Sequence, residues 1–196
     1  MTEARLHALA GIVVRVITYG YGLFWKSGWI RSRWGMKAVT ANGEAIPWLT
    51  YPAIEYVSRT VQKDWRVCEY GCGQSTVWYS KHCGEVCSVD DNPEWAAYAA
   101  SRAPSAKVSV ETEVGRYATF ATKGFDLIII DGRWRPECAR HVIKLQAPMV
   151  ILDNADNQLE ARSILAGAYK HVIPFCGLTP AFRPEETCVF LEPTGG

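Results

Sequence analysis

The stretch VCEYGCGQSTVWYSKHCGEVCSVD, residues 67–90, determines how the rest of the chain is interpreted. Arg66 to Tyr70 has the pattern of a short strand, and a glycine turn follows it at once. A helix is expected over about 75–82, and Glu85 to Val89 has the pattern of a second strand. A strand, a glycine turn, a helix and a strand in this order predict two parallel strands joined by a helix.

The same alternation continues toward the C-terminus. Phe125 to Ile130 (FDLIII) is the clearest strand pattern, because it is apolar and β-branched with no helical period. Asn92 and Thr50 are expected helix N-caps, each with a proline in the first turn. The other expected strands are 107–110, 149–152, 171–175 and 187–191, and the other expected helices are 47–62, 136–145 and 157–169. The pattern predicts an α/β fold whose mostly parallel sheet is covered by helices on both faces.

Acidic residues end four of these strands. They are Glu69, Asp90, Asp131 and Asp153. In an open parallel sheet, ligands bind outside the carboxyl ends of the strands. An ionised group there costs several kcal/mol unless it meets a partner or a ligand, so these residues predict a binding site.

The glycine turn and the acid after the second strand together indicate a nucleoside-bearing cofactor. Gly71 and Gly73 allow positive φ and close approach of a ligand. Asp90 lies 17 residues after Gly73 and can accept hydrogen bonds from both hydroxyls of a ribose. A dinucleotide site would favour a third glycine where Thr76 stands. Two alternatives remain: a turn without a ligand, and an Asp90 that caps the next helix.

Beyond these patterns, the sequence resembles the class I S-adenosylmethionine-dependent methyltransferases. The resemblance runs from Val67 to Leu191 and rests on the segments VCEYGCGQST, VCSVDDNPEW, FDLIIIDG, MVILDN and ETCVFL. The segments IPWLTYP and GLTP resemble a small bacterial subgroup of that family. The resemblance implies S-adenosylmethionine as cofactor and a Rossmann-like sheet of seven strands, whose last strand is antiparallel.

The resemblance also assigns cofactor-binding residues. They are Glu69, Gly71, Gly73, Ser75, Asp90 and Asp131. The glycine turn would face the methionine part of the cofactor, Asp90 would bind the ribose, and Asp131 would lie beside the sulfonium and the acceptor. For the adenine side, Glu111 and Glu113 both remain candidates.

A divalent metal is a sharper alternative for part of the site. In catechol and caffeoyl-CoA O-methyltransferases, which this sequence partly resembles, the residues matching Asp131, Asp153 and Asn154 hold the cation. Three oxygen ligands suit Mg²⁺, which would lower the pKa of a substrate hydroxyl. This sequence has Arg-Trp-Arg at 133–135 where those enzymes carry a lysine base, and arginine is a poor base. Otherwise, Asp131 touches cofactor or substrate while the Asp-Asn pair caps a helix.

The candidates for catalysis and substrate binding follow the fourth strand. Asp131 is the first candidate for the base, and His141 on the following helix is the second. Arg133 and Arg135 flank the expected cleft and could hold a carboxylate, a phosphate or a uronate. The alternatives are a packing or surface histidine and solvated arginines. O-methylation of a small-molecule, glycan or lipid-linked acceptor is the expected reaction.

The N-terminal part differs from the rest in charge. The chain has 196 residues, which suits one domain, here 47–196, preceded by a helical, aromatic segment at 1–46. Residues 1–40 carry a formal net charge of +5 and the remainder −4. We expect 1–46 and the loop from Cys176 to Glu186 to form a lid. The basic, aromatic segment could contact a membrane surface or form a homodimer face, or pack as an ordinary helix.

The sequence also bears on the cellular compartment and on the kinds of partner. The apolar stretch from Leu9 to Trp25 contains Arg15 and is shorter than the ~20 residues of a spanning helix. Seven cysteines without a convincing secretory signal indicate a reducing compartment, and we expect a cytoplasmic protein. The formal net charge of +1 argues against nucleic acid as a partner.

Three other functions fit parts of the pattern. An NAD-dependent enzyme is disfavoured by Thr76, and an aminopropyltransferase by the helical N-terminal segment. A binding or scaffold protein that keeps the methyltransferase fold without turnover is disfavoured by the intact glycine turn and Asp90.

Overall fold

A computed structural model describes residues 3–194 and contains one sheet of seven strands. The strand order is β3-β2-β1-β4-β5-β7-β6, and only β7 runs antiparallel to its neighbours. The strands are β1 (Arg66–Tyr70), β2 (Glu85–Asp90), β3 (Lys107–Val110), β4 (Leu127–Ile130), β5 (Met149–Leu152), β6 (Tyr169–Leu178) and β7 (Pro184–Pro193). The α/β sheet with an antiparallel last strand is therefore confirmed.

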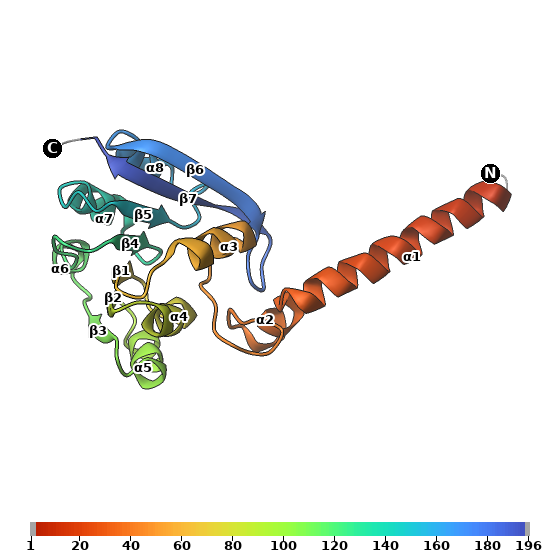
Figure 1. Ribbon diagram of the computed structural model, residues 1–196, viewed down its shortest axis with the longest axis horizontal. Coiled ribbons are helices and arrows are strands. Elements are labelled where there is room, and N and C mark those ends of the chain that lie inside the picture. The colour runs from red at the N-terminus through yellow and green to blue at the C-terminus, as the bar shows by residue number, and fades with distance from the viewer. Residues whose placement is uncertain (1–2, 195–196) are drawn as a thin grey trace.

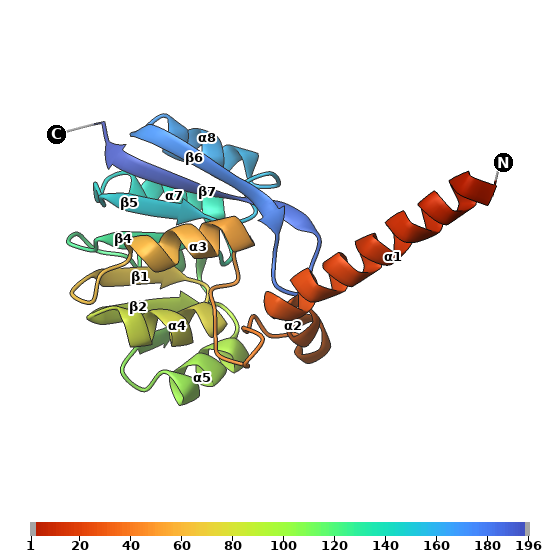
Figure 2. The ribbon, with the colours of Figure 1, turned by 45° about the vertical axis from the view of Figure 1, so that its right-hand side comes forward.

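Helices cover both faces of the sheet (Figures 1 and 2). One face carries α3 (Tyr51–Thr60), α4 (Gln74–His82) and α5 (Pro93–Arg102), and the other carries α6 (Val114–Ala118), α7 (Arg135–Val142) and α8 (Leu159–Ala166). The start of α5 is as expected, because the Asn92 side chain accepts a hydrogen bond from the backbone N–H of Glu94. Thr50 is the N-cap residue of α3, but its hydroxyl donates to the carbonyl of Phe175 instead of capping the helix.

The core consists of two layers, one on each face of the sheet. Alternate residues of a strand point to opposite faces, so Ile128 and Ile130 belong to the layer under α6–α8. Leu127 and Ile129 belong to the layer under α3 and α4. All four side chains are essentially inaccessible to solvent, which explains why FDLIII shows no polar alternation.

The strand register brings the acidic strand ends into one row. Tyr70 of β1 lies opposite Val89 on one side and Ile130 on the other, and Ile130 lies opposite Leu152. The residue after each of these positions therefore falls in the next row of the sheet. That row contains Gly71, Asp90, Asp131 and Asp153.

The ends of several elements differ from the expectation. β1, β3 and β5 have the expected bounds, but β6 and β7 extend well beyond 171–175 and 187–191 because they pair continuously down to Leu178 opposite Pro184. Pro174 and Gly177 hide this length in the sequence. Proline is tolerated here because β6 is the edge strand. Helix α3 is shorter than 47–62, since the Trp48 backbone N–H bonds the Ser75 hydroxyl instead of a helical carbonyl.

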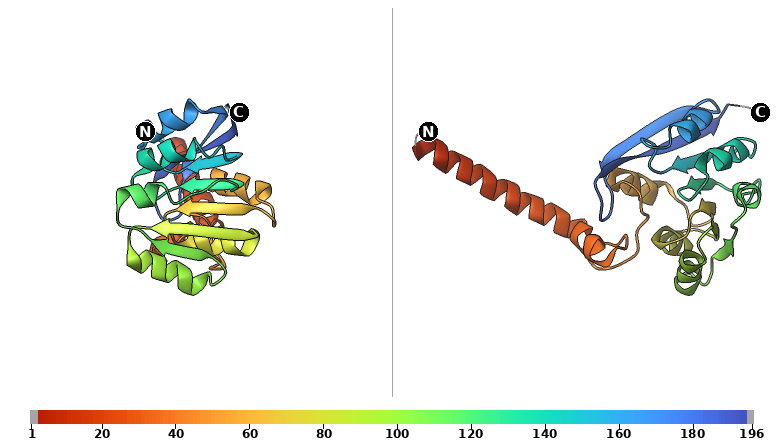
Figure 3. Two further views of the ribbon diagram at one scale, coloured as in Figure 1. Left: turned by 90° about the vertical axis from the view of Figure 1, so that its left-hand side faces the viewer. Right: turned by 180° about the vertical axis from the view of Figure 1, so that it is seen from behind.

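The N-terminal helices leave the domain. Helix α1 (Glu3–Lys26) projects away from the sheet, and α2 (Trp29–Gly35) joins it to the domain (Figures 1 and 3). Within residues 3–194, no helix is long and apolar enough to span a membrane. The expected lid therefore does not include α1, which does not cover the strand ends.

Candidate functional site

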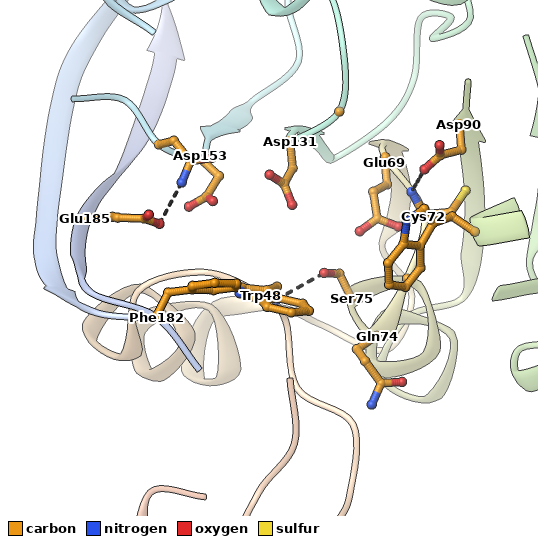
Figure 4. Close-up of a pocket in the computed structure, with 15 residues that line it drawn as sticks. Trp48, Glu69, Cys72, Gln74, Ser75, Asp90, Asp131, Asp153, Phe182 and Glu185 are labelled. Atoms are coloured by element: carbon orange, nitrogen blue, oxygen red, sulfur yellow. Dashed lines mark hydrogen bonds between the residues drawn. The ribbon is translucent and has the colours of Figure 1, made fainter. Parts of the chain in front are cut away.

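A cavity of about 400 Å³ opens at the carboxyl ends of β1, β2, β4 and β5 (Figure 4). Its walls come from the strand-end loops, from the start of α4 and from the segments before α3 and between β6 and β7. The lining residues are Trp48, Glu69, Gly71, Cys72, Gly73, Gln74, Ser75, Asp90, Trp95, Asp131, Gly132, Asp153, Asn154, Phe182 and Glu185. All six residues expected to bind the cofactor are among them.

The glycine turn brings two loops of the cavity together. Gly71 has a φ of +101°, which side chains rarely adopt, and a Cβ on it would approach the backbone of Gly132 to 3.1 Å. A Cβ on Gly132 would lie 2.9 Å from the Gly71 nitrogen. At Gly73, by contrast, a Cβ would meet nothing within 4 Å. Because Gly73 lines the cavity, this open space is room that a ligand can occupy against the backbone.

Glu69 is buried beneath the turn and ties it to α4 and β2. The hydroxyls of Thr76 and Ser88 both donate to its Oε2, at 2.6 and 3.0 Å. The Thr76 hydroxyl also accepts a hydrogen bond from the Gly73 backbone N–H at 3.0 Å. Thr76 therefore closes the turn where a dinucleotide-binding loop would carry its third glycine.

Burial raises the pKa of Glu69 to about 7, and the two hydroxyl donors only partly oppose this. In the unfolded chain the carboxyl titrates near its ordinary value. Between those two values the native state retains a proton that the unfolded state releases, so stability falls as the pH rises. From pH 5 to pH 8 we expect this group to lower the free energy of unfolding by on the order of 1–3 kcal/mol. Urea unfolding at both values should show the fall, and Glu69→Gln should remove most of it. An unchanged pH dependence in that variant would contradict the assignment.

Asp90 stands at the end of β2 with both oxygens fixed. Its Oδ2 accepts from the Cys72 backbone N–H at 2.6 Å, and its Oδ1 accepts from the Asn92 backbone N–H at 2.8 Å. Burial raises the pKa of this carboxyl. Asn92 itself caps α5, so Asp90 is not needed as a cap. Asp90 lines the cavity, and a carboxylate that accepts two backbone N–H groups has lone pairs left for two hydroxyl groups.

Neither candidate for the adenine side lines the cavity. The Glu113 side chain caps α6 by accepting from the Gly115 backbone N–H. Glu111, whose backbone N–H bonds the carbonyl of Asp90, is not among the residues of the cavity wall. Trp95, in the first turn of α5, supplies an aromatic face there instead.

The guanidinium of Arg135 joins the ends of β4 and β5. Its Nε donates to the Gly132 carbonyl at 2.9 Å. One terminal nitrogen donates to the Asp153 carbonyl and to Asn154 Oδ1, and the other to the carbonyl and Oδ1 of Asp131. A guanidinium has five N–H donors, and this network uses all five. Only 12% of the side chain is exposed.

This network does not fit a divalent metal. Asp131, Asp153 and Asn154 do lie together as expected, but Arg135 places its positive charge among them. Within residues 3–194 no group of three or more His, Cys, Asp or Glu side chains could hold a metal ion. The structure therefore does not support Mg²⁺ at these residues, because the guanidinium already contacts the oxygens that a cation would need.

The structure places the remaining candidates after β4 outside the cavity wall. Arg135 has no donor left for an anionic substrate. Arg133 is 64% exposed, pairs with Asp91 at 2.8 Å and lies over the Trp134 ring, outside the cavity wall. His141 bonds the Ala121 carbonyl through Nε2 at 2.8 Å and does not line the cavity. This placement argues against a catalytic role for His141.

Asp131 and Asp153 are neighbouring carboxyls with different surroundings. Burial raises the pKa of both, and each charge disfavours the other. Arg135 partly compensates Asp131, at 3.1 Å. Asp153 accepts from the Thr187 hydroxyl at 2.6 Å, and that hydroxyl accepts in turn from the Thr50 backbone N–H. The N-terminus of α3 is thus connected to the end of β5.

Sequence reasoning missed three residues of the far wall. Trp48 and Phe182 stack with ring centroids 5.6 Å apart, and Glu185 accepts a hydrogen bond from the Asn154 side chain at 2.8 Å. The Trp29 indole donates to the carbonyl of Phe182, which connects α2 to this loop. Phe182 and Glu185 belong to the loop that was expected in the lid, whereas Trp48 lies just beyond the expected segment 1–46. No local pattern distinguishes these three side chains from other residues of a loop.

Comparison with solved structures yields methyltransferases. NodS from Bradyrhizobium japonicum WM9, an N-methyltransferase in complex with S-adenosyl-L-homocysteine, superposes with a TM-score of 0.52 at 16% identity over 69% of this chain and 81% of its own. The magnesium protoporphyrin IX methyltransferase ChlM from Synechocystis PCC 6803, with bound SAM, gives 0.53 at 14% over 71% and 75%. The chain has the fold of the class I S-adenosylmethionine-dependent methyltransferases.

A further solved structure superposes on a larger share of this chain. The protein 1320 of Thermoplasma acidophilum gives a TM-score of 0.56 at 13% identity over 78% of this chain and 94% of its own. No protein-family model matches the sequence, and no curated protein does. At these identities the neighbours establish the methyltransferase fold but not the reaction.

Proposed function

We propose that this protein transfers a methyl group from S-adenosylmethionine to a small-molecule acceptor. The observation that carries the proposal is the joint placement of the glycine turn and Asp90 on one wall of the cavity. The cavity lies where ligands bind in open α/β sheets, and it has room against Gly73 for a ligand to contact the backbone. S-adenosylmethionine supplies an activated methyl group, so the protein mainly has to align the acceptor and exclude water.

The cofactor would occupy the part of the cavity between α4 and α5. Asp90 would accept the ribose hydroxyls, and Trp95 would provide a face for the adenine ring. Glu69 and Ser75 would lie near the methionine part. NodS and ChlM, with the same fold, were crystallised with S-adenosyl-L-homocysteine and S-adenosylmethionine, which supports this choice of cofactor.

Asp131 stands at the centre of the row of strand ends (Figure 4). Its carboxylate is held by Arg135, so its position is fixed before an acceptor arrives. Burial raises its pKa, which makes it a stronger base than an exposed carboxylate. We assign it the role of orienting the acceptor and removing its proton. The O-methylation expected from the sequence stays a prediction that this assignment does not require.

Calorimetric titration with S-adenosylhomocysteine tests the proposal. We expect the wild type to bind it, and we expect Asp90→Ala to lose about 10- to 100-fold in affinity, since hydrogen bonds to charged groups contribute ~1.5–3 kcal/mol. Asp90→Asn, which keeps one oxygen for a backbone N–H, should lose affinity without disturbing the turn. Absence of binding by the wild type would refute the cofactor assignment.

The same titration separates the rival functions. NAD binding would favour an oxidoreductase, and preference for decarboxylated S-adenosylmethionine would favour aminopropyl transfer. Binding of S-adenosylhomocysteine with no turnover of any acceptor would favour a scaffold protein.

For the N-terminal segment we propose contact with an anionic membrane surface. Large aromatic side chains are exposed on α1 and α2, among them Tyr19, Trp25 and Trp34. Basic residues accompany them, and no acidic residue occurs between Glu3 and Glu44. Exposed aromatic and basic side chains on a projecting helix fit the interface of an anionic bilayer. The homodimer expected from the sequence stays a prediction, as does a lid formed by the loop from Cys176 to Glu186 without α1.

Vesicle co-sedimentation measures this contact. We expect the wild type to sediment with vesicles that contain phosphatidylglycerol and to be released at high salt. The double variant Trp25→Ser/Trp34→Ser should stay in the supernatant. If light scattering shows a dimer and the protein does not sediment with the vesicles, a second copy of the chain covers this surface instead.

A further inference from the structure

The cavity has a second wall that the cofactor assignment leaves unused. Figure 4 shows the carboxylates of Asp131, Asp153 and Glu185 pointing into one space, with the rings of Trp48 and Phe182 across from them. This space lies on the far side of Asp131 from Asp90 and the glycine turn. We call these five side chains the acceptor wall.

The acceptor wall carries three carboxyl groups and no basic side chain. Among residues 3–194, no lysine, arginine or histidine lines the cavity. The nearest guanidinium, that of Arg135, gives all five of its N–H donors to protein oxygens, so it has none for a ligand. It pairs with Asp131, and Arg183 lies 3.8 Å from Glu185 on the loop before β7, so Asp153 is the carboxyl of the wall without an ion pair in the described part of the chain.

Asp153 is buried without a cationic partner among residues 3–194. It is 3% exposed, yet in the described part of the chain no cationic side chain lies within ion-pair distance of its carboxylate. Its side-chain donor is the neutral hydroxyl of Thr187. Burial and the charge of Asp131 both raise its pKa. A positively charged ligand would relieve this repulsion, whereas an anionic ligand would increase it.

The aromatic pair favours the same kind of ligand. Trp48 and Phe182 stack with an interplanar angle of 26°. The Trp48 backbone N–H bonds Ser75, and the Phe182 carbonyl bonds the indole of Trp29, so the backbone that carries each ring is anchored to a neighbouring segment. The faces of aromatic rings attract cations, and they do so most strongly when water is excluded. Carboxylates on one side and ring faces on the other form a site for an ammonium group.

We propose that the methyl acceptor is an amine, bound as its ammonium form by the acceptor wall, and that its nitrogen is the atom methylated. This inference rests on the proposed methyl transfer and names its substrate class.

The proposed reaction moves one proton and one methyl group. A proton of the bound ammonium passes to the Asp131 carboxylate, which frees the nitrogen lone pair. The lone pair forms a bond to the methyl carbon while the bond from that carbon to sulfur breaks, and its electron pair stays on sulfur. The positive charge moves from sulfur to the methylated nitrogen, and the proton on Asp131 passes to water. Asp153 and Glu185 would bind the ammonium before the proton transfer and the methylated, again positively charged, nitrogen after it.

A matched pair of probes tests the charge preference on protein saturated with S-adenosylhomocysteine. The probes are 2-phenylethylamine, which is cationic at pH 7, and 2-phenylethanol, its neutral analogue. We expect the amine to bind at least 10-fold more tightly. Glu185→Gln, which can still accept from Asn154, should reduce this preference, and Trp48→Leu should weaken amine binding. Glu55→Gln, on the exposed face of α3, is the matched control and should change neither affinity.

The outcomes are separable from the proposed function. If the wild type does not bind S-adenosylhomocysteine, the methyltransferase assignment fails. If it binds S-adenosylhomocysteine but binds amine and alcohol equally, or shows no detectable binding of the amine, the acceptor assignment is overturned and the cofactor assignment stands. Tighter binding of phenylacetate than of the amine would also overturn it.

Discussion

Replacing Arg135 by alanine should lower the free energy of unfolding by about 3–5 kcal/mol, because the change breaks a buried ion pair from one side. The guanidinium is nearly buried and holds together the loops after β4 and β5. Without it, the carbonyls of Asp131, Gly132 and Asp153 would lose their donors, and two neighbouring carboxyls would face each other uncompensated. Urea unfolding at pH 7 measures the effect.

Two control variants show whether the loss of stability comes from the hydrogen-bond network of Arg135. Arg135→Lys keeps the charge but offers three donors in place of five, so we expect a loss between that of alanine and none. Arg140→Ala removes a half-exposed arginine from the next turns of the same helix, and its pairs with Glu137 and Glu160 should contribute at most about 1 kcal/mol. A loss below 1 kcal/mol for Arg135→Ala would show that the network is not structural. Stabilisation of the wild type by Mg²⁺ would contradict the role assigned to the guanidinium.

The sequence predicts the parallel part of the sheet well because each strand there is defined locally. FDLIII has no period other than that of a buried strand, and a glycine or an acidic residue stops each run close to where it ends in the structure. The candidate binding residues Gly73 and Asp90 could be predicted for the same reason, because each stands at or just after the end of a parallel strand. Their placement depends on strand ends in one register, which parallel pairing enforces.

Contacts between distant segments are where local patterns fail. The role of Arg135 depends on carbonyls 18 residues away, and nothing in RWRP distinguishes a structural arginine from a substrate-binding one. The acceptor wall combines Trp48, Phe182 and Glu185 from segments far apart in the chain. Cross-strand pairing decides the lengths of β6 and β7, which proline and glycine disguise. Tertiary contacts override propensity at each of these positions.

Replacing Asp131 by asparagine should lower kcat by about 10²- to 10⁴-fold, the contribution typical of a positioned base. Asparagine keeps an oxygen that can accept from Arg135, so the loops should stay in place and the protein should remain folded. Affinity for S-adenosylhomocysteine should change little, because the proposed contacts to its ribose and methionine part come from Asp90 and the glycine turn. Release of S-adenosylhomocysteine, with an acceptor found by screening amines, gives the rate.

The pH dependence of kcat distinguishes a catalytic base from a residue that has only a structural role. A base works only when unprotonated, and burial raises the pKa of Asp131, so the wild-type kcat should rise with pH through that raised value. In Asp131→Asn this rise should disappear. Asp126→Asn, just before β4 at the opposite end of the same strand, should leave both rate and pH profile unchanged, because its carboxylate bonds only the Arg66 backbone. Full activity in Asp131→Asn would remove this residue from the mechanism. A slow variant that keeps the wild-type pH profile would assign the proton transfer to another group and leave Asp131 a positioning role.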